Sequence, residues 1–239
     1  MCLGAFCVLL VIFHFLCPTY GQSLDAIDLI GKQGMEAFLK RLQRVDWKQI
    51  DRHESYGETF IISSIFLPEK NHSIYKVDGP VHHLPEALRI FRDSSNWPKW
   101  NPFIRKNEEL QLPLRSKRVR VFYQEVKPNL QGNFEARGTF VVQREVRRRV
   151  SNSLFISYHS VDLMGIPLVA NYRTNGLKVL PIYGPTGFHV RESGTEGELS
   201  MVLDLDMQYD LPFKVTDIVT RAHLKDYIDE FNAYLLTFI

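Results

Sequence analysis

The sequence has three cysteines, and none of them lies beyond residue 17. Small secreted domains usually depend on disulfides, so residues 22–239 must be held together by a hydrophobic core instead. About 218 residues are enough to bury one such core in a single domain. A cysteine nucleophile and a cysteine-based metal site are both excluded from this part of the chain.

Other signatures of chemistry are also missing. The sequence contains no phosphate-binding loop, no dinucleotide fingerprint and no G-x-S-x-G motif, and no two histidines have the spacing of a helical metal site. A net charge of +2 argues against broad nucleic-acid binding. We therefore expect a monomer with no cofactor, no metal, no catalytic residue and no nucleic-acid partner.

An apolar run stands at the start of the chain. Residues 3–17 contain no Asp, Glu, Lys or Arg and are followed by Pro18, Thr19, Tyr20 and Gly21. This pattern predicts a signal peptide over residues 1–21, with cleavage near Gly21, and an uncleaved signal anchor is the alternative. The chain would then be secreted or reside in the lumen of the secretory pathway. Its one N-x-S/T sequon predicts a glycan on Asn71.

The remaining chain combines helical and strand patterns. Apolar spacing predicts helices over residues 24–45, 86–92 and 212–239. Runs rich in β-branched and aromatic residues predict strands over 47–52, 58–67, 73–81, 104–112, 117–126, 139–150, 154–163, 168–183 and 198–208. The short connections favour a large curved antiparallel sheet with helices on one side, which is an α+β fold.

The C-terminal helical segment has two apolar stripes on different faces. Val215, Ile218, Val219 and Ala222 form the first stripe, and Leu224, Ile228, Phe231, Leu235 and Phe238 form the second. This arrangement predicts a helix that covers two different apolar surfaces. It lies on a sheet in one interpretation and closes a cavity as a lid in the other.

Two charged residues interrupt strand faces that are otherwise apolar. Glu125 follows Val119, Val121 and Tyr123 on one face, and Arg144 follows Phe140 and Val142 on one face of the next strand. Burying either charge alone would cost several kcal/mol, so the two residues should be paired or solvated. They could be a polar anchor inside a cavity, an ion pair at the sheet rim, or residues that a shift in register places in water.

Five segments in order resemble the START (steroidogenic-acute-regulatory-related lipid-transfer) family. They are Tyr75–Val81, Trp97–Asn101, Phe140–Arg144, Ser160–Asp162 with Pro167, and Asp206 with Leu211–Pro212. The resemblance implies a helix-grip fold, in which a nine-stranded curved sheet grips a C-terminal helix around a lipid cavity. It places residues 22–239 in one START-like domain that binds one lipid and meets membranes transiently.

The same resemblance implies roles for individual residues. In sterol-binding members an acidic residue and an arginine pair inside the cavity, and Glu125 and Arg144 match those positions, which favours a sterol-like ligand over a phospholipid. Loop 127–138 resembles the gating loop, with Leu130 and Phe134 as its apolar residues. The predicted ligand-binding residues are Glu125, Arg144, Tyr123, Val121, Val142, Met201, Leu203, Leu205, Val219, Ala222 and His223.

An enzyme of the wider helix-grip superfamily, such as a cyclase or hydrolase, is the alternative function. It would need an acid–base residue in the cavity, and Glu125, Asp162 and His223 are the candidates. Because a neighbouring Arg144 would keep Glu125 ionised, that pair suits an anchor better than a general acid.

Overall fold

The computed structural model describes residues 24–127, 135–163, 169, 172–194, 196–208 and 211–238. Within them, nine antiparallel strands form one sheet in the order β1-β2-β3-β9-β8-β7-β6-β5-β4. The strands are β1 (Lys48–Ser55), β2 (Glu58–Leu67), β3 (His72–Val81), β4 (Ile104–Glu109), β5 (Val119–Val126), β6 (Arg137–Arg148), β7 (Ser153–Val161), β8 (Thr186–Ser193) and β9 (Glu196–Leu203). The predicted α+β class is confirmed.

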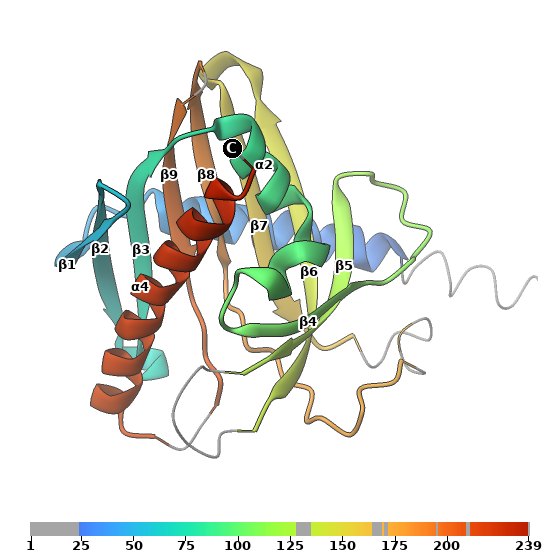
Figure 1. The fold of residues 1–239 in the computed structure, drawn as a ribbon. Coiled ribbons are helices and arrows are strands. Elements are labelled where there is room, and N and C mark those ends of the chain that lie inside the picture. Colours follow the sequence, from blue (N-terminus) through green and yellow to red (C-terminus); the bar gives the residue numbers. More distant parts are fainter. Residues whose placement is uncertain are drawn as a thin grey trace, which may run out of the picture.

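Helices cover both faces of this sheet. The long helix α4 (Phe213–Leu236) and the shorter α2 (Leu84–Arg92) lie on one face, which we call the inner face (Figure 1). The N-terminal helix, over residues 24–42, lies on the other, outer face. The prediction that the helices lie on one side of the sheet is therefore wrong.

The inner face carries the larger part of the core. Phe91 of α2 stacks on Phe231 of α4, with ring centroids 4.9 Å apart, and on Phe188 of β8 at 4.5 Å. Trp97 and Trp100, from the 3-10 helix η2 (Ser94–Lys99) and its end, also pack in this cluster. These aromatic contacts hold α2 and the C-terminal half of α4 on the sheet.

The outer face is also apolar. Ile27 of the N-terminal helix packs with Val119, Val121, Tyr123 and Val142 of β5 and β6. Farther along the same helix, Phe38 packs with Phe155 and Val202. The sheet is therefore apolar on both sides, and alternation along a strand does not reveal which side faces a cavity.

The predicted strand over residues 168–183 is wrong. In the described part of this stretch, isolated bridges join Val179 to Gly138 and Tyr183 to Leu205, without a continuous strand. Asn175 and Gly176 have φ values of 53° and 77°, and Pro181 has no N–H to donate to a ladder. The ninth strand of the sheet is instead β8, over Thr186–Ser193, and no strand was predicted there.

No helix within the described residues is both long enough and apolar enough to cross a membrane.

Candidate functional site

An internal chamber lies between the inner face of the sheet and α4. It has a volume of about 40 Å³ and we call it the inner chamber. Its lining residues come from the η2–β4 segment, the four strands β5, β7, β8 and β9, the isolated bridge between Tyr183 and Leu205, and α4. They are Trp97, Asn101, Phe103, Gln124, Tyr158, Tyr183, Thr186, Phe188, Met201, Leu203, Leu205, Leu224 and Tyr227. None of these side chains carries a formal charge.

A second space, the outer chamber, opens beside the first turns of α4. Its volume is about 210 Å³, and its walls come from α4, the segment after β9, and the start of β3 with the preceding 3-10 helix η1 (Pro68–Lys70). Phe103 and Leu205 line both chambers. These two side chains therefore form the wall between the chambers.

Three polar side chains that line these chambers are buried and have at least one polar atom without a hydrogen-bond partner among the described residues. One is His72, whose Nε2 contacts Asp204 while its Nδ1 has no partner. Gln124 on β5 is 1 % exposed, and its Oε1 has no partner among the described residues. His223 on α4 is 2 % exposed, and neither of its ring nitrogens has one there. Leaving a buried polar group unpaired costs about 1–3 kcal/mol, so these atoms mark positions where a ligand could supply the missing bonds.

His223 is held in its neutral form. Burial lowers the pKa of its imidazole below the ordinary value, and the negative charge of Asp226 only partly opposes this. A neutral imidazole offers one N–H donor and one nitrogen acceptor. His223 therefore presents both kinds of hydrogen-bonding group at the outer chamber.

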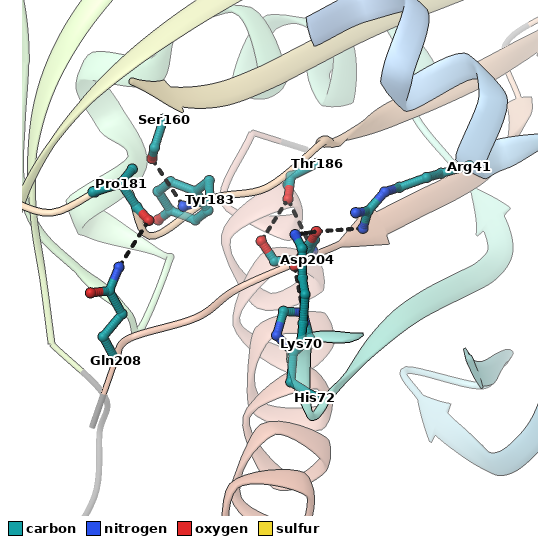
Figure 2. A network of polar contacts seen from close by, with 9 residues as sticks. All are labelled: Arg41, Lys70, His72, Ser160, Pro181, Tyr183, Thr186, Asp204 and Gln208. Carbon is teal, nitrogen blue, oxygen red and sulfur yellow. Dashed lines mark hydrogen bonds and ion pairs between the residues drawn. The ribbon is translucent and has the colours of Figure 1, made fainter. Parts of the chain in front are cut away.

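A buried carboxylate fixes the sheet end next to the chambers. Asp204 is 1 % exposed, and its Oδ1 lies 2.7 Å from His72 Nε2 while its Oδ2 lies 2.5 Å from Arg41 Nη1. Figure 2 shows these side chains converging on the carboxylate. Lys70 Nζ lies 3.7 Å from Oδ2, and the Thr186 hydroxyl accepts a bond from the Asp204 N–H. Asp204 thereby links the N-terminal helix, η1 and the start of β3 to the chain just after β9, next to the chamber residue Leu205.

The charge state of Asp204 follows from these partners. Burial alone would raise the pKa of this carboxyl, but the hydrogen bond from His72 and the positive charges of Arg41, His72 and Lys70 outweigh it, and the pKa is lowered. Asp204 is therefore ionised at neutral pH.

Polar contacts hold one edge of α4 to the sheet. The Tyr75 hydroxyl donates to Asp217, which also pairs with Arg221. Farther along α4, Lys225 Nζ lies 2.8 Å from Asp51 Oδ2, and Asp229 Oδ1 lies 2.8 Å from His53 Nε2. Asp217 lies in the N-terminal half of α4, and Lys225 and Asp229 lie in its C-terminal half together with Phe231, so polar contacts and ring packing both hold α4 to the sheet.

The predicted pair of Glu125 and Arg144 does not form. Glu125 lies opposite Gly138 and Arg144 lies opposite Val119 in the β5–β6 ladder, so the two residues stand about 20 Å apart along the strands. Arg144 Nη1 instead lies 3.3 Å from Asp28 Oδ1 of the N-terminal helix.

Three other residues that were predicted to contact the ligand also lie on the outer face of the sheet. Val121, Tyr123 and Val142 pack with the N-terminal helix and not with α4. Gln124 and Gln143, each one position earlier on its strand, point to the inner face, and Gln143 Oε1 is also buried without a partner among the described residues. A shift of one residue exchanges the two faces of a strand, and only the N-terminal helix reveals which face is which.

The other predicted site residues fall into three groups. Met201, Leu203 and Leu205 line the inner chamber, while Val219 and His223 line the outer one. Ala222 is exposed and lines neither chamber. Leu130 and Phe134 of the predicted gate lie outside the described residues.

Several lining residues were not predicted from the sequence. Asn101 ends the Trp97–Asn101 segment and Phe103 lies just beyond it, but neither belongs to a periodic pattern, so nothing local indicates their orientation. Gln124 stands between Tyr123 and Glu125, which were predicted to face the cavity, so strand alternation placed it on the opposite face. To assign the right face of β5 to the chamber, one must know that the N-terminal helix covers the other face.

Comparison with known proteins agrees with this geometry. No family model matches the sequence, and no curated protein matches it. Among solved structures, human StAR-related lipid transfer protein 5 superposes with a TM-score of 0.75 at 15% identity, over 90% of this chain and 98% of that one. A StAR-related lipid transfer protein fragment from Xanthomonas axonopodis gives 0.63 at 9% identity, over 79% of this chain and 98% of that one.

Human STARD10 gives a TM-score of 0.61 at 13% identity, over 83% of this chain and 78% of that one. The fold is therefore the helix-grip fold of StAR-related lipid transfer domains, as the sequence resemblance predicted.

Proposed function

We propose that this protein binds a single lipid in the two chambers beneath α4 and carries it between membranes. The observation that supports this most is an enclosed apolar space that contains buried, unpaired polar atoms. Apolar walls with a few convergent polar groups are the usual design of a small-molecule site. The shared fold of proteins whose names describe lipid transfer supports the same function.

A neutral, sterol-like lipid suits the chambers better than a phospholipid. A buried phosphate group needs positively charged partners, and the inner chamber is lined by none. Lys70 and His72 of the outer chamber already face Asp204. Neutral glutamine and histidine side chains match a hydroxyl group, which both donates and accepts.

A catalytic role has less support. Of the three acid–base candidates, Glu125 lies on the outer face and Asp162 is exposed. His223 alone lines a chamber, and it faces the ring of Phe103 at 4.7 Å between centroids. The described chambers therefore bring no acid–base pair together.

We also propose that the start of α4 is the part that meets the membrane. Val215 and Ile218, of the first predicted stripe, are exposed instead of covering an apolar surface, and exposed Phe66 packs against Phe213 beside them. Contiguous apolar side chains on a surface are a feature of membrane and protein interaction sites. Phe213 also lines the outer chamber, where a lipid would enter or leave.

We expect Ile218→Asp to slow lipid transfer between vesicles by about tenfold or more, because Ile218 is 66 % exposed and burying an isoleucine contributes about 1.5–3 kcal/mol. The amount of lipid bound per chain should not change. Leu29→Asp is the matched control, since Leu29 is 53 % exposed on the outer-face helix. Equal slowing in both variants would remove α4 from the docking surface.

A secreted or luminal location remains a proposal based on the sequence. It is supported by the apolar leader and by the exposed position of Asn71, which ends η1 with a φ of 51°. We expect the exported protein to begin near residue 22 and to lose mass on enzymatic deglycosylation, and Asn71→Gln to remove that difference. Cytosolic, unglycosylated protein that still begins at Met1 would contradict this location, and membrane-held protein that retains residues 1–21 would support the signal anchor.

A further inference from the structure

His223 occupies a position where a histidine is unfavourable to the protein alone. It lies in the middle of α4, is 2 % exposed, and packs its ring against Phe103 at a tilt of 39°. Neither ring nitrogen has a hydrogen-bond partner among the described residues. A phenylalanine could make the same ring contact without leaving two polar atoms unpaired, so the folded state gains nothing from the imidazole.

Gln124, on the other side of Phe103, is also a buried polar side chain with an unpaired atom. Its Oε1 is buried and unpaired at the inner chamber, while His223 lies at the outer chamber. The ring of Phe103 belongs to the wall between them. The two unpaired polar positions are therefore separate and cannot both be satisfied by one small polar group.

We propose that the ligand carries two separated hydrogen-bonding groups, and that Gln124 and His223 each recognise one of them. This inference rests on the lipid-binding function proposed above. One group must donate to Gln124 Oε1, and the other meets a neutral imidazole that can donate or accept. An apolar body with two hydroxyl groups, such as a sterol hydroxylated on both its ring and its side chain, has this chemistry, whereas a sterol with one hydroxyl leaves one position unpaired.

The test compares two radiolabelled probes, cholesterol and 25-hydroxycholesterol, which differ by one hydroxyl at the far end of the molecule. The unmodified protein should bind the second probe about tenfold more tightly, the effect of one satisfied buried hydrogen bond. His223→Phe, which keeps the ring contact, should abolish this preference. His223→Gln, which retains a donor and an acceptor, should restore at least part of it.

Thr220→Val is the matched control. Thr220 lines the same chamber, but its hydroxyl already donates to the Thr216 carbonyl at 2.8 Å. The preference for the second hydroxyl should survive this change. Gln124→Leu should weaken binding of both probes, because both carry the ring hydroxyl.

Thermal melting separates recognition from a structural role. The unliganded His223→Phe protein should melt at the same or a higher temperature than the unmodified protein, since an unpaired polar group has been removed. A marked loss of stability in His223→Phe, or equal affinity of the unmodified protein for the two probes, would overturn the inference.

Different binding results would show that the proposed function itself is wrong. If the protein binds neither sterol, the sterol class is wrong, and lipid extracted from the purified protein then decides. An extracted lipid with two separated polar groups whose binding is lost in His223→Phe supports the inference, and a lipid with one polar group overturns it. If no lipid is bound by any route, the lipid-binding function and this inference fall together.

Discussion

Asp204→Ala should lower the free energy of unfolding by about 3–5 kcal/mol, the cost expected when one partner of a buried charge network is removed. The change leaves Arg41 and His72, both largely buried, without the carboxylate that they contact at 2.5 and 2.7 Å. It also unties the N-terminal helix from the end of β9. Urea unfolding followed by circular dichroism measures the loss.

Asp206→Ala is the control for this experiment. Asp206 lies two residues farther along, is exposed, and accepts a bond from the Gln208 N–H. Its replacement should cost less than about 1 kcal/mol. Similar losses for the two variants would show that Asp204 is not the centre of a buried network.

Linking the first residue of α4 to β2 should stop lipid uptake. The chambers measure about 40 and 210 Å³, and sites for small molecules usually have volumes of about 300–1,000 Å³, so the space must widen for a lipid, and we propose α4 as the part that moves. The rings of Phe66 and Phe213 lie 4.8 Å apart, which suits a pair of cysteines joined by a short bifunctional thiol reagent. Uptake of a fluorescent sterol from vesicles should fall to background.

Residues 22–239 contain no other cysteine, so the reagent has no competing target there. Each single-cysteine variant treated with the same reagent should take up sterol normally. A linker with a cleavable disulfide should allow uptake to recover after reduction. If uptake continues at the normal rate in the linked protein, the lipid enters by another route.

The two apolar stripes of the C-terminal helix show which contacts the sequence could predict and which it could not. Its second stripe is confirmed in part, since Leu224, Ile228, Phe231 and Leu235 are buried against the inner-face core. The first stripe was expected to cover another apolar surface, but Val215 and Ile218 are exposed and Val219 alone lines the outer chamber. Periodicity identifies apolar faces but does not distinguish a face that packs within the chain from one that meets an external surface.

The site residues were harder to predict for a related reason. The segments that resemble the lipid-transfer family gave the correct fold, yet Glu125 and Arg144 were assigned to the wrong face of the sheet. Asp204 carries no signal of a site in the sequence, and Arg41 and His72 converge on its buried carboxylate from distant parts of the chain. Such contacts depend on the tertiary arrangement and leave no periodic signal.

Native mass spectrometry of the purified protein tests the central claim most directly. We expect one bound lipid molecule per chain, which is released on denaturation and identified by its mass. Leu203→Trp, which fills the inner chamber, should lose this lipid, while Leu29→Trp on the outer-face helix should retain it. Protein that carries no lipid after exposure to a mixed lipid extract, or Leu203→Trp protein that retains the lipid at full occupancy, would contradict a lipid site beneath α4.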